Sequence, residues 1–364
     1  MRKILITVLI AAGLTAGGAP ASAIAPAPGD IVSRTAASLP APLQGKGTAL
    51  RIEYRTTDIK GASITATGLV ITPKSNKRNQ VVVWAHGTTG LADQCTPSLN
   101  QNVFWPEARA AVLELLNRGY TVVAPDYPGL GTPQAHPYLI GESEARSIID
   151  IVKSSRIVDP LLSTKYVIDG HSQGGQGALF AGEIAPGYDG NLVLKGVAAI
   201  APASNLDLIA PDIPDAPGKG YLVMAIYGLS AVDSAVKPDQ VLATPAKQKT
   251  SVLQTGCLNE ILDAYEPLTR EQLVPGGTVP NIVITKLAQY GNPAKRPSSA
   301  PILIVHGTAD EAVPYQITSD VLVPQLQQYS QPVQLITLEG RTHEGAVFDS
   351  TTTVANWITQ RFAS

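Results

Sequence analysis

The chain has 364 residues, of which 15% are charged, and its formal net charge is −2. This balance provides neither a basic face for nucleic acid nor a polybasic segment for acidic lipid, so we expect no nucleic-acid partner and at most transient contact with a lipid interface. A chain of this length can bury one large core, either as a single α/β domain or as a domain with an insertion.

The first segment is typical of a secretory signal peptide. A basic start precedes a short apolar run, and Ala21, Ser22 and Ala23 have the small-x-small pattern that signal peptidase needs. We therefore expect residues 1–23 to be removed and the mature protein to be secreted. No later stretch is long and apolar enough to cross a bilayer. A leader rich in proline and alanine is expected over residues 24–45.

Strand-like and helix-like segments then alternate along the chain. Segments rich in Thr, Ile and Val predict antiparallel strands, and continuous apolar runs predict strands buried on both faces. The expected strands are residues 49–55, 63–73, 80–86, 120–126, 165–171, 195–202, 301–307 and 332–339, and the expected helices are 106–118, 141–157 and 351–362. This order is typical of the α/β class, with a mostly parallel eight-stranded sheet between two layers of helices.

One long interval separates two of these strands. About 100 residues lie between Pro202 and Pro301, whereas a crossover helix with short loops needs roughly 20–25. The surplus predicts a cap inserted at 203–300 into a core formed by 46–202 and 301–364. The apolar segment 220–232 in this insertion predicts a helix that either lines a ligand site or packs in a core.

The sequence around Ser172 indicates a nucleophile. Gly170-His171-Ser172-Gln173-Gly174 follows a buried strand and leads into a helix of small residues. This is the strand–turn–helix context of the G-x-S-x-G nucleophile elbow. The two glycines allow the strand and the helix to approach closely while Ser172 takes a strained backbone conformation. We therefore predict that Ser172 is a nucleophile rather than a structural serine in a tight turn.

A nucleophilic serine needs a histidine base, and the chain has five histidines. His343 follows the last strand, where the α/β-hydrolase chain order places the base. His171 is expected to point away from its neighbouring serine. Turn geometry explains His86 and His306, each at a strand end before a glycine, and the loop around His136 predicts a surface residue. We predict that His343 is the base.

The base in turn needs an acid that orients it. Asp310 follows the apolar run "PILIVHG" and lies between the serine and the histidine in chain order. Its neighbour Glu311 would require a different loop conformation. The predicted triad is therefore Ser172, Asp310 and His343.

Acyl transfer also needs donors for the developing oxyanion. One is expected to be the backbone N–H of Gln173, directly after the nucleophile. The second is expected in the loop "GTTGLADQC", from Thr88 or Thr89. The alternative for this loop is a plain glycine turn, and the spacing does not distinguish the two threonines.

The remaining motifs are few. Cys95 and Cys257 are the two cysteines, and in an oxidising compartment they either form one disulfide or remain as two buried thiols. The sequence has no metal-ligand spacing and no dinucleotide- or phosphate-binding loop. We therefore expect no metal and no cofactor.

Taken together, these segments resemble a known family. "GHSQGG", "HGTADEAVP", "HGTTGLADQCTPS", the late histidine and the long insertion are similar to those of the secretory lipase family in the α/β-hydrolase superfamily. The resemblance implies triad roles for Ser172, Asp310 and His343, a cap that shelters an acyl pocket, and a disulfide between Cys95 and Cys257. It covers nearly all of the mature chain.

The sequence therefore predicts a secreted serine hydrolase that cleaves carboxylic esters, as a lipase or an esterase, through an acyl-enzyme on Ser172. A secreted serine peptidase or acyltransferase with the same triad is the alternative. A non-catalytic binding protein on a hydrolase scaffold is a third hypothesis, because fold alone does not establish function. The acyl chain length and the oligomeric state stay open.

Overall fold

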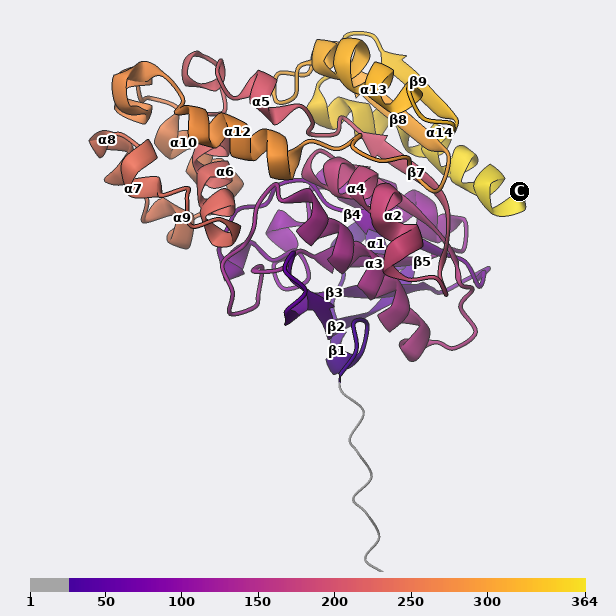
Figure 1. The fold of residues 1–364 in the computed structure, drawn as a ribbon. Helices are drawn as coiled ribbons and strands as arrows, with labels where there is room; N and C mark the ends of the chain where they lie inside the picture. The colour runs from indigo at the N-terminus through magenta and orange to yellow at the C-terminus, as the bar shows by residue number, and fades with distance from the viewer. Residues whose placement is uncertain (1–25) are drawn as a thin grey trace, which may run out of the picture.

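A nine-stranded sheet forms the centre of the computed structural model, which describes residues 26–364 (Figure 1). The predicted signal peptide, residues 1–23, lies outside the described residues. The strands are β1 (Ile31–Ala37), β2 (Gly47–Thr57), β3 (Ser63–Pro73), β4 (Val81–Ala85), β5 (Thr121–Asp126), β6 (Lys165–His171), β7 (Val193–Ile200), β8 (Ile302–Gly307) and β9 (Val333–Leu338).

Most of this sheet is parallel. The strand order is β1-β2-β3-β5-β4-β6-β7-β8-β9. The pairs β1–β2, β2–β3 and β3–β5 are antiparallel, and every neighbouring pair from β5 to β9 is parallel. The predicted α/β class with a mostly parallel sheet is therefore confirmed.

The sheet has one strand more than the eight that the sequence predicts. The additional strand β1 lies within residues 24–45, where a leader was expected. Its central side chains are exposed, so it lacks the apolar pattern that identifies the other strands. Backbone pairing with β2 holds it at the edge of the sheet, with Thr35 opposite Arg51. Such pairing leaves no signature in side-chain hydropathy.

Helices cover both faces of the sheet because side chains alternate along its buried strands. In β4, Val81 and Val83 pack in one hydrophobic cluster with α3 and α4, whereas Val82 and Trp84 pack in a second cluster with α2 and α14. The covering helices are α1 (Ala41–Gln44), α2 (Pro106–Asn117), α3 (Gly141–Val158), α4 (Gln173–Tyr188), α13 (Val323–Gln327) and α14 (His343–Ala363), with a π-helical turn at Ile317–Leu322. The result is a three-layer α/β/α arrangement.

The interval between β7 and β8 is helical. Figure 1 shows most of its helices gathered at one end of the molecule, beside the sheet. They pack on a third hydrophobic cluster, to which Leu222, Val223 and Leu229 of α6 contribute. The helices are α5 (Leu206–Ile209), α6 (Lys219–Val232), α7 (Pro238–Val241), α8 (Thr244–Lys247), α9 (Val252–Thr255), α10 (Leu258–Tyr265), α11 (Arg270–Leu273) and α12 (Asn281–Gly291), with short 3-10 turns at Ile213–Asp215 and Pro275–Gly277.

A disulfide joins this helical interval to the sheet. Cys95, in the loop after β4, is bonded to Cys257 at the start of α10, with a Cα–Cα distance of 5.4 Å. Beside it, the N–H of Leu258 donates to the carbonyl of Thr89 across 2.9 Å. The predicted disulfide is confirmed, and the two buried thiols are excluded.

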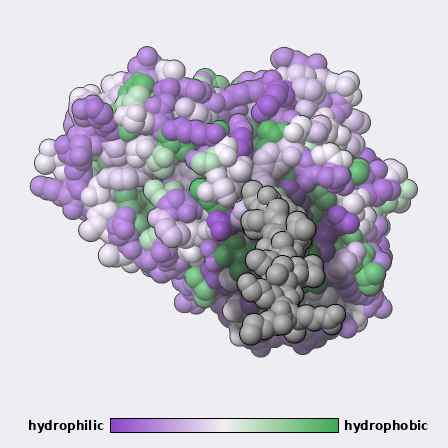
Figure 2. Space-filling view, turned by 60° about the horizontal axis from the view of Figure 1, so that its bottom comes forward, coloured by the Kyte–Doolittle hydropathy of each residue, from purple (hydrophilic) through white to green (hydrophobic). Residues whose placement is uncertain are grey.

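Hydrophobic residues on the surface are scattered. On the face shown in Figure 2, hydrophilic residues cover most of the surface, and hydrophobic residues form small separate patches. Isolated apolar residues of this kind are normal on a protein surface.

Candidate active site

Ser172 lies at a sharp turn between β6 and α4, as the elbow motif predicts. Its backbone dihedrals are φ 57° and ψ −119°, a combination that non-glycine residues rarely adopt. Three backbone hydrogen bonds hold this conformation: Ser172 donates to Ile200 and accepts from Gln176 and Ala203. The nearby packing therefore maintains the strain.

Close backbone approach explains the glycines of the motif. A Cβ atom on Gly170 would lie 2.3 Å from the carbonyl oxygen of Gly174, and one on Gly174 would lie 2.0 Å from the carbonyl oxygen of Ala85. Both distances are shorter than a van der Waals contact, so strand β6, helix α4 and strand β4 meet here only because these side chains are absent.

Asp310 accepts four hydrogen bonds in the loop after β8. Its Oδ1 accepts from the backbone N–H groups of Ala312 and Val313, both at 2.9 Å. Its Oδ2 lies 2.6 Å from Nδ1 of His343 and 3.0 Å from Nε2 of His306. Burial alone would raise the pKa of Asp310, but the hydrogen bonds from the two histidines hold it well below its usual value. Asp310 is therefore ionised at neutral pH.

His343 is the first residue of helix α14. The sequence places this helix at 351–362, but it begins at His343, where the Thr342 side chain caps it by accepting from the N–H of Gly345. Gly345 weakens the helical pattern of the first turn, which explains why the sequence places the start of this helix too late. Since Nδ1 of His343 faces Asp310, its Nε2 is directed away from the acid.

His171 supports His343 from the other side. The rings of the two histidines are 4.5 Å apart, and Nε2 of His171 donates to the backbone carbonyl of His343 across 3.2 Å. Burial and the neighbouring His343 lower the pKa of His171 well below its usual value. His171 is thus a neutral, packed neighbour of the predicted base.

The structure also assigns a partner to His306, which the sequence explains by turn geometry alone. Its Nε2 faces both Asp310 and the carbonyl of Val313, each at 3.0 Å, so this nitrogen carries the proton. His306 and Asp310 lie only four residues apart in "HGTAD". This short spacing is the feature of the sequence from which their contact could have been predicted.

The prediction that His136 lies on the surface is wrong. His136 is 4% exposed, and its Nδ1 lies 2.7 Å from the carbonyl oxygen of Pro128. The side chain of Gln173 contacts it and donates to Glu144 across 2.9 Å. Burial raises the pKa of Glu144 to about 8, so this carboxyl is protonated at neutral pH. Polar flanking residues hid the burial of His136, because the helical interval covers this loop.

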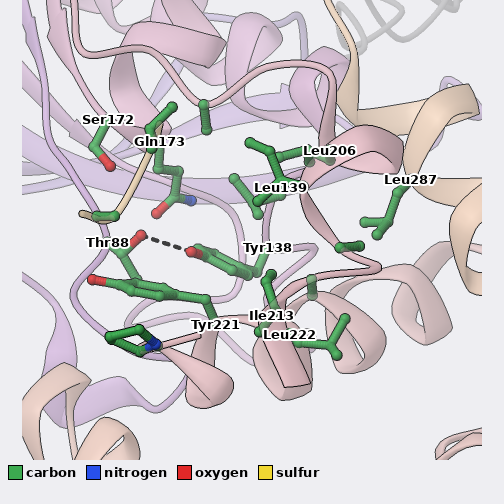
Figure 3. A pocket seen from close by; sticks show the side chains of 18 residues that line it. Thr88, Tyr138, Leu139, Ser172, Gln173, Leu206, Ile213, Tyr221, Leu222 and Leu287 are labelled. Atoms are coloured by element: carbon green, nitrogen blue, oxygen red, sulfur yellow. Dashed lines mark hydrogen bonds between the residues drawn. The ribbon is translucent and has the colours of Figure 1, made fainter. Parts of the chain in front are cut away.

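A mostly apolar cavity opens beside Ser172. In Figure 3, Ser172 and the hydrogen-bonded pair of Thr88 and Tyr138 lie at one end, and Leu206 and Leu287 lie at the other. Helix α6 contributes Tyr221, Leu222 and Ala225 to the lining. One side of α6 therefore lines this cavity, and the rest of the helix packs in the third hydrophobic cluster.

A second, more polar cavity also borders Ser172. Ser172, Thr88 and Tyr221 line both cavities. His343, His171 and Glu107 line the second alone. Ser172 and His343 therefore face the same open space, at the boundary between an apolar and a more polar cavity.

The two candidate oxyanion threonines differ in position. Thr88 lines both cavities, and its carbonyl accepts from the Trp105 indole across 3.0 Å. Thr89 lines neither, and its carbonyl is bonded to Leu258. Within residues 26–364, the backbone N–H groups of Thr88 and Gln173 donate to no protein acceptor. Both are therefore available to a ligand.

The secretory lipase family matches residues 107–364. The chain belongs to the secretory lipase family. It is a secreted enzyme that hydrolyses carboxylic esters. Within residues 26–364, no helix combines the length and hydrophobicity needed to cross a membrane.

Relatives of this secretory lipase include a secreted triacylglycerol lipase, LIP7, of Malassezia globosa. It is 25% identical over 362 residues, which cover 92% of this chain and 76% of the relative. Lipase A of Candida antarctica in its closed state has a similar fold, with a TM-score of 0.77 at 18% identity, covering 93% of this chain and 83% of that one. The rice cell wall degrading esterase LipA of Xanthomonas oryzae has a TM-score of 0.74 at 21% identity, covering 92% and 97%.

Proposed function

We propose that Ser172, His343 and Asp310 are the catalytic triad and that the acyl-enzyme forms on Ser172. The observation that carries this proposal is the 2.6 Å contact between Nδ1 of His343 and Oδ2 of Asp310. His343 also lines the same cavity as Ser172. With Nδ1–H donated to an ionised carboxylate, Nε2 is unprotonated and accepts the serine proton. Asp310 then stabilises the imidazolium that forms.

Two backbone N–H groups would stabilise the tetrahedral oxyanion. Gln173 is the first residue of α4, so its N–H lacks a helical acceptor, and the macrodipole adds a partial positive charge there. Thr88 supplies the second donor, since it lines the cavities beside Ser172 whereas Thr89 does not. This choice between the threonines was open from the sequence.

The apolar cavity would hold the acyl chain. Beyond Ser172, Gln173 and Thr88, its lining consists of aliphatic residues and two tyrosines, as an acyl chain requires. Residues 203–300 would act as a cap over this cavity, because α5, α6 and α12 all line it. An apolar acyl site and relatives named triacylglycerol lipases support a lipid ester as the substrate.

The test compares Ser172→Ala with the wild type on p-nitrophenyl esters. Loss of the nucleophile is expected to lower kcat by about 10⁴-fold or more, as in other serine hydrolases. The control is Ser75→Ala, which replaces an exposed serine just after β3 that lines neither cavity, and it should keep the wild-type rate. Wild-type turnover by Ser172→Ala would refute the triad. Turnover of aminoacyl amides above esters would instead favour a peptidase.

A further inference from the structure

The second cavity beside Ser172 is placed to receive the alcohol half of the ester. Ser172 lies at the boundary of the two cavities, so an ester whose acyl chain fills the apolar one directs its alcohol into the other. The second cavity differs in chemistry, because Glu107, Glu344 and Asn259 line it together with His343. The two halves of the substrate therefore meet different surroundings.

Glu107 is the unusual residue of this cavity. It is the second residue of helix α2, the residue is only 6% exposed, and its carboxyl is hydrogen-bonded by its own backbone N–H and by no other residue within 26–364. Buried Asp126, by contrast, accepts from the Thr67 hydroxyl at 2.7 Å and the Ser98 N–H at 3.1 Å. A single backbone hydrogen bond leaves acceptor positions of the Glu107 carboxyl open toward the cavity, where a donor on a ligand can fill them.

No neighbouring charge in the described part of the chain neutralises the Glu107 carboxyl through an ion pair. Burial raises the pKa of Glu107 to about 7. The hydrogen bond from its own backbone N–H opposes this rise, Glu344 adds to it, and His343 and Arg109 oppose it. None of these neighbours forms an ion pair with Glu107 among the described residues, where Glu344 is an exposed acid at the edge of the cavity. A donor on a ligand would meet one or two carboxyl groups here, and an anion would be repelled.

We infer that Glu107 is a specificity-determining residue that binds a hydrogen-bond donor, a hydroxyl or an ammonium group, on the alcohol half of the ester. The inference rests on the proposed function, since it needs an ester bound at Ser172. Esters of alcohols that carry such a donor are preferred over esters of plain alkyl alcohols. Esters of anionic alcohols are disfavoured.

The experiment uses esters that share one acyl chain and differ in the alcohol: ethanol, glycerol, 2-(dimethylamino)ethanol and glycolate. The measured quantity is kcat/KM for each ester relative to the ethyl ester. Two variants of Glu107 distinguish a hydroxyl donor from an ammonium donor. Glu107→Gln removes the charge and keeps an acceptor, whereas Glu107→Met removes both at similar size. Asp263→Asn is the matched control, because it neutralises an exposed acid on α10 that lines neither cavity.

A charge-assisted hydrogen bond corresponds to roughly a tenfold effect on these ratios. If an ammonium group is the donor, the ratio for the 2-(dimethylamino)ethyl ester, whose protonated amine carries one N–H, falls about tenfold in both variants. If a hydroxyl is the donor, the glyceryl ratio falls in Glu107→Met and is kept in Glu107→Gln. The glycolate ratio rises in both variants. Ratios that equal the wild-type values in both variants overturn the inference.

A fluorophosphonate probe distinguishes this outcome from failure of the proposed function, because it labels the nucleophile without an alcohol half. No labelling of Ser172 in the wild type refutes the proposed function itself. Labelling in the wild type and both variants, with unchanged ester ratios, refutes only the role of Glu107. Glu107→Met is set aside if it no longer unfolds cooperatively on heating. In that case Glu107→Gln, which conserves size, tests the inference: a higher glycolate ratio than in the wild type supports it, and an unchanged ratio overturns it.

Discussion

Nε2 of His306 lies 3.0 Å from Oδ2 of Asp310, the same oxygen that Nδ1 of His343 approaches at 2.6 Å. One carboxylate oxygen thus connects two histidines, and only one of them shares a cavity with Ser172. The other oxygen is held by the N–H groups of Ala312 and Val313. Asp310 is therefore fixed from several directions, and His306 is a positioning residue for the acid.

Replacing His306 with Phe is expected to lower kcat by about 10- to 100-fold, the equivalent of one hydrogen bond to a buried charge. KM should change little, because His306 lines neither cavity. Steady-state kinetics on a soluble ester measure both values. His306→Gln, which keeps an N–H donor, should recover part of the loss. Wild-type kcat in the Phe variant would contradict the role.

Filling the apolar cavity should shorten the preferred acyl chain. Ala225 lines this cavity from α6, and Ala225→Trp would occupy part of the space that a long chain needs. We expect kcat/KM for long-chain esters to fall at least about tenfold relative to short-chain esters, since a misfit in an apolar pocket costs roughly this much. A chain-length series of p-nitrophenyl esters measures the shift. Ala231→Trp, exposed on the same helix, is the control and should leave the profile unchanged.

Removing the disulfide should weaken both stability and catalysis. The bond closes a loop of 162 residues, and the double variant Cys95→Ala/Cys257→Ala should lose about 2–5 kcal/mol of unfolding free energy. The rate should fall as well, because the bond tethers the segment of Thr88 to α10. Urea unfolding and ester hydrolysis measure the two effects, and reduced wild type is the comparison. A variant as stable as the oxidised protein would contradict this prediction.

Glu144 should make stability depend on pH in a defined direction. Burial raises the pKa of Glu144 to about 8, above its value of about 4.3 in the unfolded chain. Between these values the folded protein holds a proton that the unfolded chain releases, so stability is full below about pH 4 and falls as pH rises toward 8. The slope from this group is at most about 1.4 kcal/mol per pH unit.

Glu144→Gln removes this contribution while keeping a neutral partner for Gln173. Relative to the wild type, the variant should therefore gain stability steadily from pH 5 to pH 8. Urea unfolding at several pH values gives the difference between the two proteins. Parallel curves for the two proteins across this range would contradict the raised pKa. Glu142→Gln, half-exposed on the same helix and paired with Arg146, is the control.

Local patterns in the sequence predict much of the fold and the elbow. Eight strands follow from runs of apolar residues, and "GHSQGG" predicts the turn at Ser172 because its glycines permit a contact that any Cβ would block. Chain order alone selects Asp310 and His343. Strand β1 was missed because backbone pairing, not apolar side chains, holds it at the sheet edge.

The sequence by itself therefore determined the class of fold, the elbow and the candidates for acid and base, because each depends on residues that are neighbours in the chain. Only the tertiary structure decided that His306 faces Asp310, that His136 is buried, and that Glu107 lines a cavity beside Ser172. Burial and cavity shape arise where distant segments pack together. A side chain's hydropathy does not reveal which segment will cover it.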